Sequence, residues 1–104
     1  MTSDRLRGHV DLLLLSVLED EQAHGYRLAE ALRMRSGGAF DLPEGTIYPS
    51  LYRLERNGLV ASRWERVDGR RRRVYRVTSR GTTELARRRD DWHTFARAIE
   101  AVVA

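Results

Sequence analysis

The 104-residue sequence contains no cysteine. Disulfide frameworks, thiolate zinc sites and cysteine nucleophiles are therefore excluded. Long apolar stretches are also missing, because the longest run, Leu12 to Leu15, is far too short to span a bilayer. Residues 1–5 lack the basic and then apolar layout of a signal peptide. We therefore expect a cytoplasmic protein with no membrane partner.

Lysine is absent as well, so all 19 basic residues are arginine. The planar guanidinium of arginine suits phosphate groups and guanine edges. Residues 1–43 hold 5 Arg and 7 acids (−2), residues 44–81 hold 10 Arg and 4 acids (+6), and residues 82–104 hold 4 of each (0). We therefore expect any anionic partner to meet the middle third of the chain.

No arrangement for catalysis or metal binding is visible in the sequence. His9, His24 and His93 are far apart, and none pairs with a carboxylate at metal-ligand spacing within its own helix. The sequence contains no G-x-S-x-G motif, no phosphate-binding glycine loop and no suggested pair of nucleophile and base. We expect neither an enzyme nor a cofactor or metal site.

The apolar pattern predicts a mainly α-helical fold with one β-hairpin. Helical spacing predicts a first helix over about residues 6–19 and a second that opens at His24-Gly25-Tyr26 and ends at Gly37-Gly38. A third helix carries Ile47, Leu51 and Leu54 on one face and stops at Asn57-Gly58.

The two prolines bear on the start of the third helix. Pro43 suits a first helical position, where no amide is needed. Pro49 would clash with the carbonyl of Gly45 in a continuous helix. We therefore expect an irregular first turn before about residue 47.

Residues 59–67 and 72–78 are typical of two strands. Asp68-Gly69 between them favours positive φ and hence a tight hairpin turn. Tyr75 and Val77 should share one face, with Trp64 packed near them. Thr78 or Ser79 can cap a final helix that runs to about Val103. This order predicts a winged helix-turn-helix domain over residues 1–78, followed by a C-terminal dimerisation helix over residues 79–104.

The hairpin is expected to bind DNA. Four consecutive arginines, Arg70 to Arg73, follow its tip, and the flanking strands carry more. Such a cluster can simply keep edge strands soluble. Four adjacent like charges repel one another, however, which favours phosphate or minor-groove binding. Arg70 and Arg71, nearest the tip, should reach the DNA most readily.

The third helix is expected to act as the recognition helix. Its small residues let the backbone approach a groove, and Arg53 could bind a guanine edge or a phosphate. Tyr48 and Tyr52 border the buried stripe; either can be core packing, and we favour phosphate contact only for Tyr48. Gly25-Tyr26 offers backbone amides at a helix start. The candidate DNA-binding residues are Tyr26, Thr46, Tyr48, Pro49, Ser50, Arg53, Arg70, Arg71 and Arg72; Arg56 shares the exposed side of the third helix.

The last helix shows an apolar seam at heptad spacing, interrupted by Arg88. The seam could pack on its own domain, but a helix of this length should extend beyond the core, which favours a homodimer. Trp92 could also line an effector pocket, although interface packing is the plainer role. The expected interface residues are Leu85, Trp92, Phe95, Ile99 and Val102.

These residues resemble the PadR family of bacterial transcriptional regulators. The resemblance spans about residues 10–81 and rests on Leu12-Leu13-Leu14-Leu15 with His24-Gly25-Tyr26, on Glu44-Gly45-Thr46-Ile47-Tyr48-Pro49-Ser50-Leu51 with Arg53-Leu54-Glu55, on Gly58-Leu59-Val60, and on Gly69-Arg70-Arg71-Arg72 leading to Tyr75-Arg76-Val77-Thr78. A single helix after the hairpin is similar to the compact subgroup of the family.

The resemblance implies a homodimer built through the C-terminal helix and helped by the first helix. It also implies repression through operator binding, relieved in some members by aromatic or other small effectors. Trp92 falls where some compact members stack planar ligands. The family often has Ser or Asn where Pro43 stands, so a side-chain cap is absent here.

Two hypotheses follow. The chain is either a dimeric repressor that binds double-stranded DNA at a palindromic operator, or a winged-helix adaptor whose arginines face an acidic protein. Repression, as distinct from DNA binding, is implied by the resemblance alone.

Overall fold

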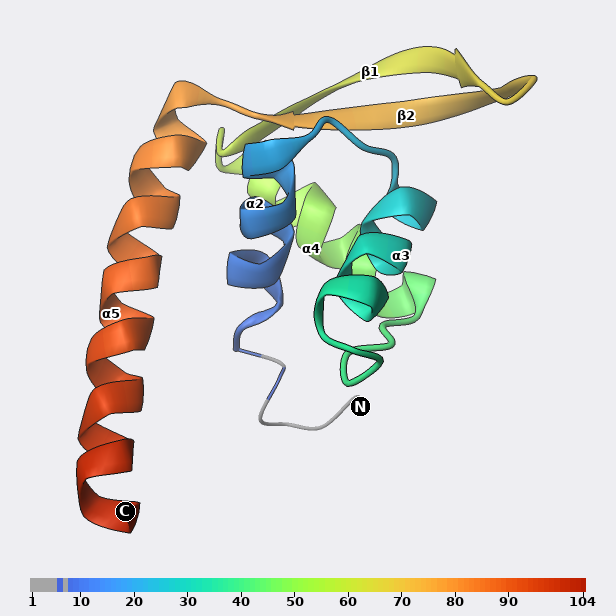
Figure 1. The fold of residues 1–104 in the computed structure, drawn as a ribbon. Coiled ribbons are helices and arrows are strands. Elements are labelled where there is room, and N and C mark those ends of the chain that lie inside the picture. The colour runs from blue at the N-terminus through green and yellow to red at the C-terminus, as the bar shows by residue number, and fades with distance from the viewer. Residues whose placement is uncertain (1–5, 7) are drawn as a thin grey trace.

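The computed structural model describes Leu6 and residues 8–104. Three helices form a bundle, a hairpin lies across one end of it, and a long last helix runs alongside (Figure 1). The elements are α2 (Val10–Asp20), α3 (Gly25–Arg35), α4 (Glu44–Arg56), β1 (Val60–Val67), β2 (Arg70–Val77) and α5 (Ser79–Val103). The predicted absence of a signal peptide concerns residues 1–5, which lie outside the described residues.

The core joins all of these elements. Its most deeply buried side chains are aliphatic and come from α2, α3, α4, β1 and α5: Leu14, Leu15, Val17, Leu28, Ile47, Leu51, Leu54, Val60 and Leu85. Full burial of such a side chain stabilises a fold by about 1.5–3 kcal/mol. The helical spacing of these residues is the reason the three-helix bundle forms. α2 itself begins at Val10, later than the predicted residue 6.

Helix α4 starts differently from the prediction. It is a continuous α-helix from Glu44, with Pro49 inside it and Pro43 as the N-cap residue. The carbonyl of Pro43 accepts from the amide of Ile47 at 3.2 Å. Gly45 and Pro49 are both exposed, so the Gly45 carbonyl, which has no amide partner at residue 49, can tilt toward water. The expected irregular first turn is therefore wrong, and so is the placement of Pro43 at the first helical position.

The hairpin follows the prediction closely. β1 and β2 pair antiparallel, from Val60 opposite Val77 to Val67 opposite Arg70. The two turn residues have positive φ, 51° at Asp68 and 77° at Gly69, which is the backbone of a type I′ turn. Because this turn is only two residues long, β2 begins at Arg70 and not at Arg72.

The inner half of the hairpin is attached to the bundle. Tyr75 donates its amide to the carbonyl of Ala23 at 2.8 Å and accepts from the amide of Ala23 at 3.1 Å. Tyr75 is buried, and Val77 packs partly buried against the core. Trp64 shares their face, but lies further out, opposite Arg73, and is 53% exposed. The expected packing of Trp64 near Tyr75 and Val77 is therefore wrong.

Helix α5 begins at a tight corner. Thr78 caps it: its side-chain oxygen accepts from the amide of Gly81 at 3.1 Å and donates to the carbonyl of Gly58 at 2.6 Å. A Cβ on Gly81 would lie 1.9 Å from the carbonyl oxygen of Leu59. Only glycine fits at this contact, which brings the start of α5 directly against the start of the hairpin.

Replacing Gly81 by alanine should therefore destabilise the protein by about 1–3 kcal/mol, because the backbone at Leu59 must move. Gly45→Ala is the matched control, since Gly45 is also helical but nothing lies within 4 Å of its Cβ position. That change should stabilise by about 0.5 kcal/mol through helix propensity. Urea unfolding measures both, and equal effects would contradict the close contact.

Candidate nucleic-acid interface

Helix α4 presents an exposed face, part of which lies beside the hairpin. Its buried side holds Ile47, Leu51 and Leu54, as expected. The exposed residues of α4 include Tyr48, Pro49, Tyr52, Arg53 and Arg56, and Thr46 is half-buried. Ser50 is only 3% exposed, so its expected place on the exposed face is wrong. Its hydroxyl oxygen accepts from Nη2 of Arg53 at 3.1 Å.

Tyr52 is more prominent on this face than its sequence position suggested. Its side chain is 66% exposed, more than the 41% of Tyr48, and the Arg56 guanidinium lies 5.7 Å from its ring centre. Tyr52 is three residues after Pro49 and four before Arg56, a spacing that puts all three on one helical face. Periodicity could therefore have found it.

The start of α3 adjoins this face. His24 caps α3, because its Nδ1 accepts the amide of Arg27 at 3.2 Å. Burial, followed by the nearby charge of Arg72, lowers the pKa of His24 below 6.5, which keeps the imidazole neutral and able to accept. A Cβ on Gly25 would lie 2.6 Å from the ring of Tyr48, so glycine allows α3 and α4 to meet closely here. Tyr26 next to it is 59% exposed.

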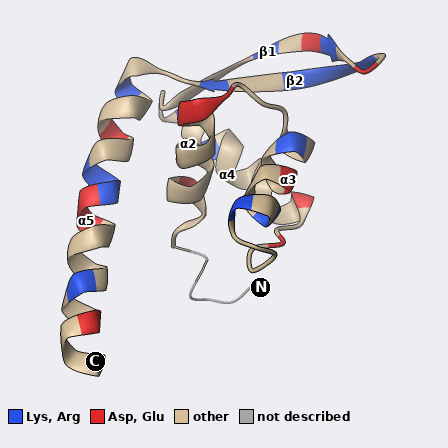
Figure 2. Cartoon of the chain, viewed as in Figure 1, with Lys and Arg blue, Asp and Glu red and all other residues tan. Residues whose placement is uncertain are grey.

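The hairpin arginines divide between two faces. Alternation along β2 places Arg71 and Arg73 on one face and Arg70 and Arg72 on the other. The guanidinium groups of Arg71 and Arg73 lie 4.7 Å and 5.4 Å from the ring centre of Trp64. Arg72 lies 6.0 Å from the ring of Tyr26, so it connects the hairpin to α3. Figure 2 shows the positive charge gathered on the projecting part of β2.

A polar chain joins the hairpin to α4. Arg73 donates to the hydroxyl of Ser62 at 2.7 Å, and Ser62 donates to the carboxylate of Glu55 at 2.7 Å. Beside it lies an open groove of about 500 Å³, lined by Tyr52, Glu55, Arg56, Arg73 and Tyr75. Burial raises the pKa of Tyr75 above 10.0, so its hydroxyl remains a donor. Arginine and tyrosine donors around an open groove can bind phosphate oxygens.

Arg53 is directed away from the exposed face of α4. Its Nη2 lies 3.2 Å from Oδ1 of Asp11 on α2, as well as near Ser50. The structure thus places Arg72 beside Tyr26 and Arg73 beside the groove that Tyr52 and Arg56 line, and Tyr48 and Pro49 are exposed on α4. Ser50 is buried, and Nη2 of Arg53 lies near Asp11 of α2.

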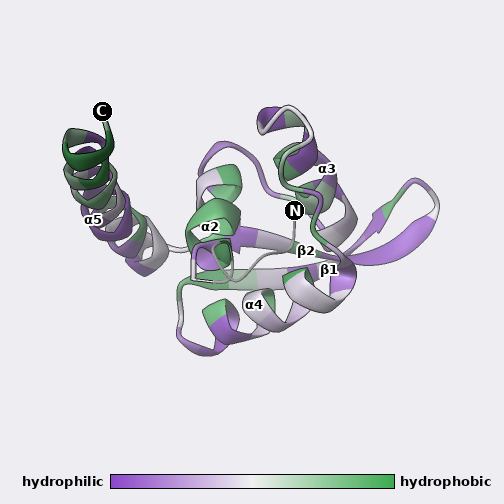
Figure 3. Cartoon of the chain, turned by 90° about the horizontal axis from the view of Figure 1, so that it is seen from below, coloured by the Kyte–Doolittle hydropathy of each residue, from purple (hydrophilic) through white to green (hydrophobic). Residues whose placement is uncertain are grey.

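A second surface lies on α5. Leu85 is 1% exposed and packs in the core of its own chain, so its expected place on an exposed seam is wrong. The seam begins later: Trp92 is 42%, Phe95 57%, Ile99 46% and Val102 89% exposed. Figure 3 shows the hydrophobic C-terminal end of this helix standing clear of the bundle.

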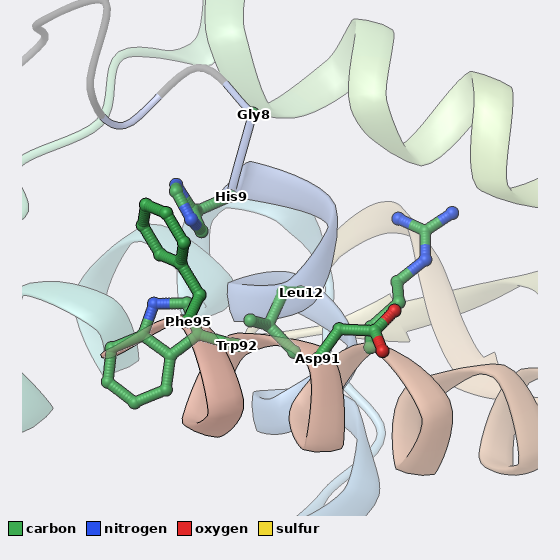
Figure 4. Close-up of a pocket in the computed structure, with 7 residues that line it drawn as sticks. Gly8, His9, Leu12, Asp91, Trp92 and Phe95 are labelled. Carbon is green, nitrogen blue, oxygen red and sulfur yellow. The ribbon is translucent and has the colours of Figure 1, made fainter. Parts of the chain in front are cut away.

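A cavity of about 310 Å³ opens where this surface meets α2. Its lining residues are Gly8, His9, Leu12, Arg88, Asp91, Trp92 and Phe95. The rings of Trp92 and Phe95 stand beside His9 and Leu12 (Figure 4). Aromatic faces next to charged groups suit a planar polar ligand. Among the residues that the structure describes, no three His, Asp or Glu side chains are grouped to hold a metal, and no helix is long and apolar enough to cross a membrane.

Known proteins share both sequence and fold with this chain. The family model described as "Transcriptional regulator PadR-like family" matches residues 14–87. The transcriptional regulator Rv3488 of Mycobacterium tuberculosis is 39% identical over 93 residues, which cover 89% of this chain and 84% of that protein.

Solved structures agree with this match. A transcriptional regulator from Clostridium thermocellum superposes with a TM-score of 0.90 at 29% identity and covers 98% of this chain and 100% of its own. A PadR family transcription regulator from Clostridium difficile R20291 superposes with a TM-score of 0.80 at 29% identity, and the match covers 93% of this chain and 100% of that one. The winged-helix prediction is thereby confirmed, and so is the expectation that the chain is a regulator and not an enzyme. The family match over residues 14–87 and the 39% identical relative show that the chain belongs to the PadR-like family of transcriptional regulators.

Proposed function

We propose that this regulator is a dimeric repressor that binds a palindromic operator through α4 and the β1–β2 hairpin. One observation carries the DNA-binding part: an arginine-rich hairpin projects beside the exposed face of α4, and Arg72 also reaches Tyr26 on α3. In this arrangement α4 enters the major groove and the hairpin contacts the flanking backbone or minor groove. The residues proposed to touch DNA are Tyr26, Thr46, Tyr48, Pro49, Tyr52, Arg56, Arg70, Arg71, Arg72 and Arg73, and Arg53 can join them once it leaves Asp11.

Selection of bound sequences from random duplex DNA by the purified protein tests this function. We expect an enriched motif with two-fold symmetry, because two copies would present two α4 helices and two hairpins. The alternative is an adaptor whose arginines bind an acidic protein. It is favoured if no motif is enriched.

The hairpin tip can be tested on the selected DNA. Arg70→Ala with Arg71→Ala should weaken binding and lower the slope of log affinity against log salt by about 0.9 for each phosphate that the protein no longer neutralises. Arg87→Ala with Arg97→Ala removes the same charge from exposed positions on α5, outside the hairpin. The control should keep the wild-type slope. Equal slopes for both double variants would contradict the proposed role of the hairpin.

The dimer is proposed from the C-terminal half of α5. Trp92, Phe95, Ile99 and Val102 form a stripe at heptad spacing, and much of its apolar surface is exposed. Burying this stripe against the same stripe of a second copy satisfies a two-fold axis. We therefore propose that residues 1–78 form the DNA-binding part and residues 79–104 the dimerisation helix. As a regulator of an operator, the protein would act in the cytoplasm.

Ile99→Asp should convert the dimer to a monomer, since it places a charge in the middle of the apolar stripe. Ala101→Asp introduces the same side chain at an exposed position outside the stripe and should leave the dimer intact. Sedimentation velocity measures both. If the Ile99→Asp variant forms dimers as stable as those of the wild type, the apolar stripe of α5 is not the dimer interface.

We further propose that the cavity beside Trp92 takes a small planar aromatic effector that relieves repression. Its support is the pairing of two aromatic rings with Arg88 and Asp91 around about 310 Å³. Packing of Trp92 within the dimer is the alternative role.

Trp92 fluorescence can separate these roles, once the second indole is removed. Trp64 is itself exposed, so the assay uses a Trp64→Phe background. Planar aromatic compounds that bind should quench Trp92, and Phe95→Ala should weaken the quenching. A panel of compounds without any quenching would leave Trp92 as a packing residue.

A further inference from the structure

Asp11 connects three helices through one carboxylate. Its Oδ1 lies 3.2 Å from Nη2 of Arg53 on α4, and its Oδ2 lies 3.6 Å from Nη1 of Arg88 on α5. The Asp11 side chain is 20% exposed, less than either arginine. A half-buried carboxylate is costly without a positive partner, and Asp11 has two.

This contact turns Arg53 toward α2. The same Nη2 that approaches Asp11 also donates to Ser50 at 3.1 Å, so the guanidinium lies toward α2. While Nη2 is held by Asp11 and Ser50, the guanidinium cannot use that group in a two-pronged contact with a base edge or a phosphate. A DNA contact that uses Nη2 therefore requires that Arg53 leave Asp11.

Arg88 is placed to compensate for that departure. It already approaches the other oxygen of Asp11, and its Nε donates to Glu84 at 3.3 Å, which anchors the side chain. When Arg53 leaves, Asp11 retains a positive partner from α5. The cost of releasing Arg53 is therefore smaller than for an isolated ion pair.

We propose that Asp11 is a positioning residue for DNA recognition: it holds Arg53 off the proposed DNA-binding surface, and Arg88 remains as its positive partner when Arg53 turns to DNA. This inference rests on the proposed function. It also links α4 to the cavity on α5, because Arg88 lines that cavity. A ligand group that engages Arg88 would leave Asp11 to bind Arg53 alone.

The test titrates the selected operator DNA with pairs of matched variants. Glu19 and Arg89 supply the controls, since they form another ion pair between α2 and α5, at 3.0 Å, and none of the ion pairs of the described residues joins them to α4. Asp11→Asn should raise affinity about two- to fivefold relative to Glu19→Gln, the factor expected for one exposed ion pair. Arg88→Met should lower affinity relative to Arg89→Met, because Asp11 then holds Arg53 more firmly.

Arg53 separates positioning from a merely structural role. In an Arg53→Gln background, Asp11→Asn should raise affinity no more than Glu19→Gln does, and the salt slope should fall by about 0.9 if Arg53 contacts a phosphate. Equal effects of Asp11→Asn and Glu19→Gln, or an Asp11 effect that persists in Arg53→Gln, would overturn the inference.

The outcome for the proposed function is visible in the same titrations. If the wild-type protein binds and the Arg70→Ala, Arg71→Ala variant binds weakly, a failure of the Asp11 variants refutes the positioning role alone. If the wild-type protein selects no DNA, both proposals fall together.

Discussion

The attachment of the hairpin to the bundle is the constraint on which the proposed DNA-binding surface depends. Two backbone hydrogen bonds between Ala23 and Tyr75 form an antiparallel β-bridge, which ties the α2–α3 connection to β2. The burial of Val60 and Tyr75 then fixes the inner half of the hairpin. Because side chains alternate strictly along a strand, this anchor also decides which arginines further out lie on each face. A shift by one residue would exchange the faces of Arg71 and Arg72.

The partners of the arginines explain why the hairpin keeps its charge. Many arginines outside the hairpin lie on carboxylates, as Arg27 does on Glu21 at 2.8 Å and Arg35 on Asp20 at 2.7 Å. On the hairpin, Arg63 and Arg73 also approach carboxylates, those of Glu65 at 2.6 Å and Glu55 at 3.9 Å. Nearer the tip of β2, however, Arg71 lies over Trp64 and Arg72 over Tyr26. An aromatic ring orients a guanidinium without cancelling its charge. The aromatic residues therefore fix the direction of the arginines while the field that attracts phosphates is preserved.

Much of this arrangement could be predicted from the sequence because it depends on local rules. Asp68-Gly69 requires a two-residue turn, and Thr78 caps α5 as expected. The predictions that were wrong concern side chains whose burial depends on a neighbouring element. Ser50 is polar, yet it is buried, and Arg53 gives its hydroxyl a partner. Leu85 fits the heptad seam, yet the core reaches it because Gly81 lets α5 start so close to Leu59. Periodicity gives the direction of a side chain, but not what lies in that direction.

Helix α5 therefore has two halves of different character on one continuous backbone. Its first half belongs to the core through Gly81 and Leu85, and its second half carries the exposed aromatic stripe. Arg88 lies between them, within reach of Asp11 and at the edge of the cavity that Trp92 lines. Gly81 and Leu85 hold the first half against the core, and Gly81 has no space to yield. A displacement of the aromatic half would therefore act first on the ion pairs that join α5 to α2, which are Arg88 with Asp11 and Arg89 with Glu19. Of these two carboxylates, Asp11 is the one that also lies on an arginine of α4, so it is where such a displacement would reach α4.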